Sequence, residues 1–142
     1  MKIYLLDKNI ICEPIKKNPS EKVIEKLAEN LEYSCISAFT WAETLAGVKT
    51  LTEVKQKNAL SEYFVENVQK QYEVLTFDSN AASIYSDLVE RLNEKEISSE
   101  KLDLLLASIA ISNNLILVTK NPAAFEAIAS NSTLMLENWF EE

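Results

Sequence analysis

The sequence predicts a three-layer α/β fold, in which a central parallel sheet of four to five strands carries helices on both faces. Short apolar runs alternate along the chain with longer segments whose apolar residues recur at helical spacing. The clearest runs, 2–6 and 115–119, are continuously apolar, as expected for strands buried on both faces. No repeat, linker or low-complexity segment breaks this order, so residues 1–142 are expected to form one domain.

The first half of the chain is predicted to hold three strands separated by helices. Ser20 and Ser37 are expected to cap helices, and the helix after Ser37 is expected to stop near Gly47, the only glycine. A long helix is expected to open at Thr52 and end near Gln71. The expected strands are residues 2–6, 31–37 and 73–77.

The second half continues the alternation. Asp78 is expected to cap a helix that carries apolar residues as far as Leu92, and a polar loop follows. Residues 102–111 are almost all apolar, which favours a buried helix. Asn121 and Pro122 are typical of a helix start, with the asparagine as the cap. The expected strands are residues 115–119 and 134–136.

Three acidic residues lie in apolar surroundings. Asp7 directly follows the first strand, at the end of the sheet where open α/β folds hold ligands. Glu43 lies within the apolar segment 36–45, and Asp103 lies in the first turn of the buried helix. Taken singly, the three would be a helix cap, a solvated helix residue and a partner of the helix dipole. Taken together, they predict carboxylates that converge on one hard cation.

Composition narrows the possible chemistry. The chain has no histidine, which excludes imidazole-based triads, histidine-based RNA cleavage and the usual zinc hydrolase sites. A hydrolase built from carboxylates would use Mg²⁺ or Mn²⁺, which prefer oxygen ligands. Cys12 and Cys35 form no CxxC pair, and two cysteines in a chain of this length are typical of a reducing compartment.

Charge and hydropathy limit the partners. A formal charge of −8 argues against a protein that grips nucleic acid through a broad basic surface, although it leaves room for an enzyme that meets phosphate through bound metal. The first apolar run is too short for a signal peptide, and no run has the length of a membrane span. A cytoplasmic protein without a membrane partner is therefore expected.

Four segments, in order along the chain, resemble motifs of the PIN-domain family, and most closely of the VapC-type toxins of bacterial toxin–antitoxin pairs. They are LLDKNII at 5–11, ISAFTWAETLAGV at 36–48, DLLLA at 103–107, and LVTKN at 117–121 followed by Phe125-Glu126. Because the matches span the chain in family order, the resemblance implies that residues 1–142 form a single PIN-like domain.

The resemblance implies an endoribonuclease whose Asp7, Glu43 and Asp103 bind Mg²⁺ or Mn²⁺, with Asn9, Thr119 and Asn121 in support. Its implied partners are an RNA substrate, a cognate VapB-like antitoxin and a second copy of the chain in a homodimer. Three carboxylates about 5 Å apart would repel by roughly 3 kcal/mol per pair at an effective dielectric constant near 20. A divalent ion reverses the sign of that interaction.

Two positions depart from the family pattern. Lys8 replaces the usual threonine after the first aspartate, and Ala124 stands where the family usually has a fourth acid. An ammonium beside Asp7 and a missing ligand would weaken metal binding, so a catalytically impaired PIN module that keeps its partner binding is the alternative. A phosphoacceptor receiver domain is a third hypothesis. It is less well supported, since receivers have an acidic pair after the first strand.

Overall fold

The computed structural model describes residues 1–141, and within them a single sheet of five parallel strands forms the centre of the molecule. The strands lie side by side in the order β3-β2-β1-β4-β5. They are β1 (Tyr4–Leu6), β2 (Ser34–Ser37), β3 (Glu73–Leu75), β4 (Ile116–Val118) and β5 (Met135–Glu137). The predicted parallel sheet is confirmed.

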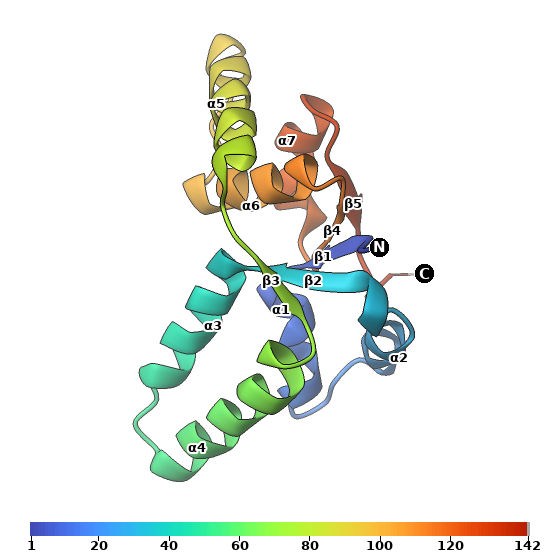
Figure 1. Ribbon diagram of the computed structural model, residues 1–142, viewed down its shortest axis with the longest axis vertical. Coiled ribbons are helices and arrows are strands. Elements are labelled where there is room, and N and C mark those ends of the chain that lie inside the picture. The colour runs from blue at the N-terminus through green and yellow to red at the C-terminus, as the bar shows by residue number, and fades with distance from the viewer. Residues whose placement is uncertain (142) are drawn as a thin grey trace.

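Helices cover both faces of this sheet (Figure 1). One face carries α1 (Lys8–Ile11), α2 (Glu21–Glu29), α3 (Ala38–Lys49) and α4 (Val54–Tyr63), and the other carries α5 (Ser79–Glu94), α6 (Lys101–Ser112) and α7 (Glu126–Ser130). Short helical turns join them: η1 (Glu13–Ile15), η2 (Leu31–Tyr33), η3 (Phe64–Gln69) and η4 (Pro122–Phe125). No helix within residues 1–141 is long and apolar enough to cross a membrane.

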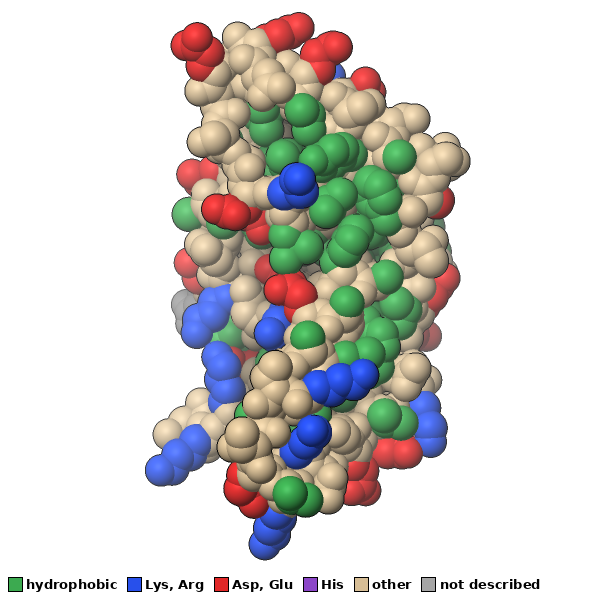
Figure 2. Space-filling view, turned by 90° about the vertical axis from the view of Figure 1, so that its left-hand side faces the viewer, with side chains coloured by type: hydrophobic (Ala, Val, Ile, Leu, Met, Phe, Trp, Pro, Cys, Tyr) green, Lys and Arg blue, Asp and Glu red, His purple; other side chains and the backbone are tan. Residues whose placement is uncertain are grey.

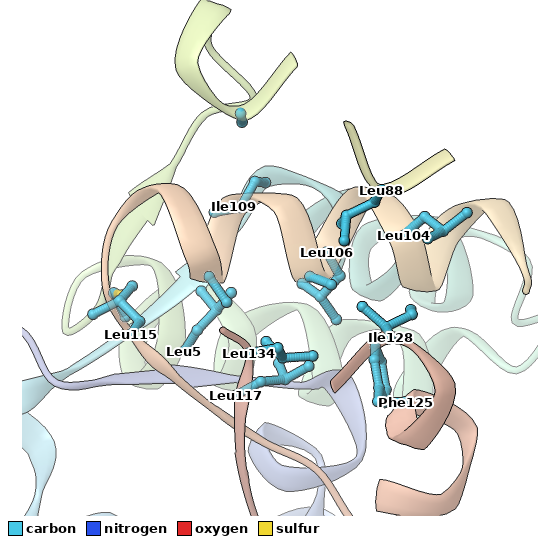
Figure 3. Packing of buried hydrophobic residues seen from close by; sticks show 14 of the residues in the cluster. Leu5, Leu88, Leu104, Leu106, Ile109, Leu115, Leu117, Phe125, Ile128 and Leu134 are labelled. Atoms are coloured by element: carbon cyan, nitrogen blue, oxygen red, sulfur yellow. The ribbon is translucent and has the colours of Figure 1, made fainter. Parts of the chain in front are cut away.

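Two cores lie on opposite faces of the sheet, because successive residues of a strand point to opposite sides. Leu5 packs into the core beneath α5, α6 and α7, whereas Leu6 packs into the core of α1 to α4 and Trp139. In the first core, Leu88 of α5 reaches one side of α6, and Leu5 and Leu117 lie on its other side (Figure 3). The helix α6 is thus enclosed on both sides, which explains its almost continuous apolar sequence.

Several predicted boundaries were wrong. Gly47 does not end its helix, because α3 continues to Lys49 and the glycine keeps an ordinary helical conformation. Residues 31–33 form the turn η2, so the second strand begins only at Ser34. The fourth helix begins at Val54 with Glu53 as its cap, since the Glu53 carboxylate accepts the Gln56 N–H at 2.8 Å.

Other local predictions hold. Ser20, Ser37 and Asp78 cap their helices by accepting backbone N–H groups at 3.3, 3.0 and 2.9 Å. The segment after Thr52 ends near Gln71 as expected, although its last part winds as the π-helical η3. Asn121 does precede a proline-led helical turn, but its side chain makes no capping hydrogen bond there.

Candidate functional site

The candidate site lies where the order of the strands reverses. From β1 the chain crosses to β2 on one side, and the other neighbour of β1 is β4, which comes much later in the sequence. Asp7 follows β1 directly, and Thr119 follows β4. Such a switch point, at the carboxyl ends of parallel strands, is where open α/β sheets bind their ligands.

Asp7 is held by hydrogen bonds on both carboxylate oxygens. Its Oδ1 accepts the Lys8 N–H at 2.8 Å, which caps α1, and its Oδ2 accepts the hydroxyl of Thr119 at 2.9 Å. The Asp7 N–H in turn donates to the carbonyl of Val118 at 2.9 Å. Asp7 is therefore both the cap of α1 and the predicted metal ligand. Its carboxylate links the end of β1 to the end of β4.

Thr119 and Asn9 extend this network. Thr119 is fully buried, and its Oγ1 also accepts the Asn121 N–H at 3.2 Å and a long contact from the Asn9 amide at 3.4 Å. The carbonyl oxygen of the Asn9 side chain accepts the Lys120 N–H at 3.0 Å. Asn9 and Thr119 thus both lie at the site, whereas Asn121 contributes a backbone group. Together they fix the segment after β4 against the start of α1.

Asp103 lies in the first turn of α6, as predicted, and its surroundings disfavour its charged form. Its pKa is raised, first by burial and then by the negative charges of Asp7, Glu100 and Glu43. The charges of the other two predicted acids therefore reach Asp103. Unlike Asp7, neither Asp103 nor Glu43 accepts a hydrogen bond from residues 1–141.

The carboxylates share an electrostatic field without forming a closed cluster. In the described part of the chain, no three histidine, cysteine, aspartate or glutamate side chains lie close enough together to form a ready-made ion site. Convergence on one ion thus stays a prediction. The donor set itself fits Mg²⁺ or Mn²⁺, because it consists of oxygen atoms and its charges repel around Asp103, an interaction that a divalent ion relieves.

The Lys8 ammonium lies beside Gly47 of α3, one turn after Glu43. Its Nζ lies 3.9 Å from the position that a Cβ on Gly47 would take, and its side chain lines a groove between α1 and α3. Among residues 1–141 it forms no ion pair with Asp7, Glu43 or Asp103. The ammonium therefore lies beside the site and leaves the carboxylates unpaired.

Sequence reasoning missed Glu100. It is the residue before α6, three positions ahead of Asp103, and its charge contributes to the raised pKa of that carboxyl. The spacing was a usable signal, because residues three apart at a helix start lie on the same side. Glu100 and Asp103 also line a cavity with Ala124, at the position where the family usually has an acid.

The cysteines offer no alternative nucleophile. Burial raises the pKa of the Cys12 thiol, and burial raises that of Cys35 to about 12. Both are free thiols, and a thiol with a raised pKa holds its proton at neutral pH. Carboxylates and hydroxyls are thus the groups left to act at this end of the sheet.

Comparison with known proteins settles the family. The model of the PIN domain matches residues 4–131. The chain belongs to the PIN-domain family. It is 33% identical to Ribonuclease VapC2 of Rickettsia felis over 96% of this chain and 98% of that protein. It is also 33% identical to Toxin FitB of Neisseria gonorrhoeae over 88% of this chain and 92% of that protein.

The fold agrees with a solved structure as well. The crystal structure of FitAcB from Neisseria gonorrhoeae matches with a TM-score of 0.89 and 28% identity, covering 99% of this chain and 100% of that one. The family resemblance expected from the sequence and the predicted three-layer architecture are therefore confirmed.

Proposed function

We propose that residues 1–142 form a single PIN domain that acts as a metal-dependent endoribonuclease toxin of the VapC type. Asp7, Glu43 and Asp103 would hold Mg²⁺ or Mn²⁺. The observation that carries the proposal is the pairing of Asp7 with Thr119 across the switch point, together with an Asp103 whose pKa is raised by burial and then by the other acids. The ribonuclease and toxin names of the relatives support the same reading.

Each residue has a distinct part in this proposal. Asp7 is the fixed ligand, because two hydrogen bonds hold its carboxylate in place. Thr119 and Asn9 orient it, and Asp103 and Glu43 complete the negative site from α6 and α3. When bound, the metal would polarise a phosphate oxygen and lower the pKa of a water that attacks the phosphodiester.

Lysines near the site support an RNA substrate despite the acidic chain. Lys16 lies 2.9 Å from the carboxylate of Glu13, and the pKa of Glu13 is lowered chiefly by that hydrogen bond and further by the charge of Lys120. Lys120 directly follows Thr119 and lies 4.8 Å from the ring centre of Phe140. Lys16 is already paired with Glu13, so the Lys120 ammonium is the group that would neutralise a phosphate of a strand that enters the site.

We propose a VapB-like antitoxin and a second copy of the chain as partners in the cytoplasm. The groove beside Lys8 has a volume of about 160 Å³, is lined by apolar residues such as Ile15 and Phe64, and fits a segment of the antitoxin. Apolar side chains also gather on the side of the molecule where α3 and α5 lie (Figure 2). That face would bury its apolar area in a homodimer.

The impaired PIN module is the second candidate, and Ala124 is the observation that favours it. The position faces the cavity beside Asp103 without supplying a carboxylate. Lys8 gives it little support, because among the described residues its ammonium forms no ion pair with the three acids. The active ribonuclease and the impaired module would share the fold and the partner surfaces. They would differ only in whether the protein cleaves RNA.

The experiment compares RNA cleavage by the wild type, Asp7→Asn and Asp103→Asn with Mg²⁺, Mn²⁺ or EDTA. We expect each substitution to reduce cleavage by more than about 100-fold, since a ligand matters more than the groups that support it. Glu90→Gln, an exposed acid on α5, is the matched control. Cleavage that survives EDTA or either substitution would place the active site elsewhere. A wild type that folds but never cleaves RNA would favour the impaired module.

A further inference from the structure

A second cavity opens directly beside Asp103. It has a volume of about 400 Å³ and lies between the loop before α6 and the η4–α7 segment, two regions far apart in the sequence. This volume falls within the range of about 300–1,000 Å³ that ligand pockets span. Its lining residues are Ser98, Ser99, Glu100, Asp103, Ala123, Ala124 and Ala127.

The two walls differ in chemistry. The η4–α7 segment contributes three alanines, whose methyl side chains have no hydrogen-bonding group. The loop before α6 and the first turn of α6 contribute two serines and the acids Glu100 and Asp103. Such a pocket repels phosphate, because both of its charges are negative. It suits a planar, neutral group that carries N–H donors on one edge.

We propose that this cavity receives a guanine base of the RNA substrate, next to the phosphate that is cleaved, with Glu100 reading its Watson–Crick edge. The proposal rests on the proposed ribonuclease function and adds a base preference to it. A carboxylate accepts two parallel hydrogen bonds, and guanine alone among the four RNA bases presents two adjacent donors, N1–H and the N2 amino group, on that edge. Proteins read single-stranded RNA through unstacked bases of this kind.

The position of Ala124 gives the pocket its room. A family-type acid there would occupy part of the cavity and add a third negative charge to its lining. The departure that removes a proposed metal ligand therefore creates an apolar surface for a base. Glu100 itself is exposed at the rim, where a base from solvent can reach it.

Nucleoside binding tests the pocket without requiring catalysis. Guanosine, inosine, adenosine, cytidine and uridine are titrated into the full chain in EDTA, and the methyl NMR signals of the three alanines report binding. We expect saturable shifts with guanosine and affinity about tenfold weaker for the other four. Inosine is the matched ligand, because it lacks only the 2-amino group. Equal binding of all five, or alanine signals that do not move, would overturn the proposal.

Two variants test separately whether the base fits the cavity and whether Glu100 recognises its edge. Ala127→Leu should fill the half-buried side of the cavity and weaken guanosine binding at least about tenfold. Glu100→Gln should reduce the preference for guanosine over inosine. The NH₂ group of the glutamine amide would face an N–H donor of guanine, where the glutamate has an acceptor oxygen. Ala82→Leu, on an exposed position of α5, is the control and should bind like the wild type. Unchanged guanosine affinity in both pocket variants would overturn the assignment.

Cleavage assays then distinguish this failure from failure of the proposed function. Short RNAs that differ only by guanosine, inosine or adenosine beside one cleavage site are compared. RNA cleavage without base preference, together with no guanosine binding, would overturn the guanine-binding proposal and still support the ribonuclease function. Guanosine binding without any RNA cleavage would support the cavity as a base-binding site but contradict the proposed ribonuclease function. It would also overturn the placement of the bound base beside a cleaved phosphate.

Discussion

Two parts of the candidate site are built in different ways. Asp7 comes directly after a strand, and both of its carboxylate oxygens are occupied by donors from α1 and from Thr119. Asp103 and Glu43 lie on helices from opposite faces of the sheet, and within residues 1–141 neither accepts a hydrogen bond. One part is fixed by the fold, while the other carries negative charge that the protein leaves unpaired.

The difference shows how a site can be both stable and reactive. Hydrogen bonds to a carboxylate stabilise its charged form, so Asp7 contributes to the fold as a helix cap as well as to the site. Burial and neighbouring negative charges do the opposite at Asp103, whose pKa they raise. A bound cation would convert that unfavourable interaction into a favourable one.

The first prediction tests the hydrogen bond that supports Asp7. Thr119→Val removes the hydroxyl that donates to Asp7 Oδ2 while keeping the shape of a fully buried side chain. We expect metal-dependent RNA cleavage to fall by about 10- to 100-fold, as when other groups that orient a metal ligand are removed. Thr52→Val, at an exposed threonine, is the control. Unchanged cleavage in Thr119→Val would show that the hydroxyl does not position the carboxylate.

The second prediction concerns stability without metal, where the two parts should respond with opposite signs. Asp7→Ala removes the cap of α1 and the acceptor of Thr119, so it should cost about 1–2 kcal/mol. Asp103→Asn removes a repelling charge and should raise the melting temperature at pH 7. The increase in the free energy of unfolding should stay below about 1 kcal/mol, because the Asp103 side chain is partly solvated.

The pH dependence checks this sign. The pKa of Asp103 is higher in the folded than in the unfolded chain, so the folded state binds the proton more tightly. Wild-type stability should thus decline as pH rises from the unfolded pKa through the raised folded value. Thermal melts in EDTA from pH 3 to 7 should show the advantage of Asp103→Asn shrinking on acidification. An advantage that grows toward low pH would contradict the interpretation.

The last prediction concerns metal affinity at the two departures from the family pattern. Lys8→Thr should change Mn²⁺ affinity by less than about threefold, because the ammonium lies toward Gly47 and pairs with no acid among the described residues. Ala124→Asp adds a carboxylate to the cavity beside Asp103 and should tighten binding by about tenfold, or about 1.4 kcal/mol. Calorimetry measures both. A strong gain from Lys8→Thr alone would show that the lysine does reach the cation.

Sequence patterns alone predicted the order of the main helices and strands and pointed to three acids as candidates for the site. Continuous apolar runs predicted β1 and β4, and the cap residues Ser37 and Asp78 predicted where helices begin, because both signals are local. Ends were less predictable. Gly47 looked like a stop, yet packing of Val48 in the core carries α3 further.

Only the tertiary structure decided how the site is connected. The bond between Asp7 and Thr119 joins residues more than a hundred positions apart, and it depends on β1 lying beside β4. The direction of Lys8 and the cavity between Glu100 and Ala124 likewise follow from how helices pack. Local sequence specifies which groups are present and which element carries them. Their distances and partners are set by contacts that form only when distant segments come together.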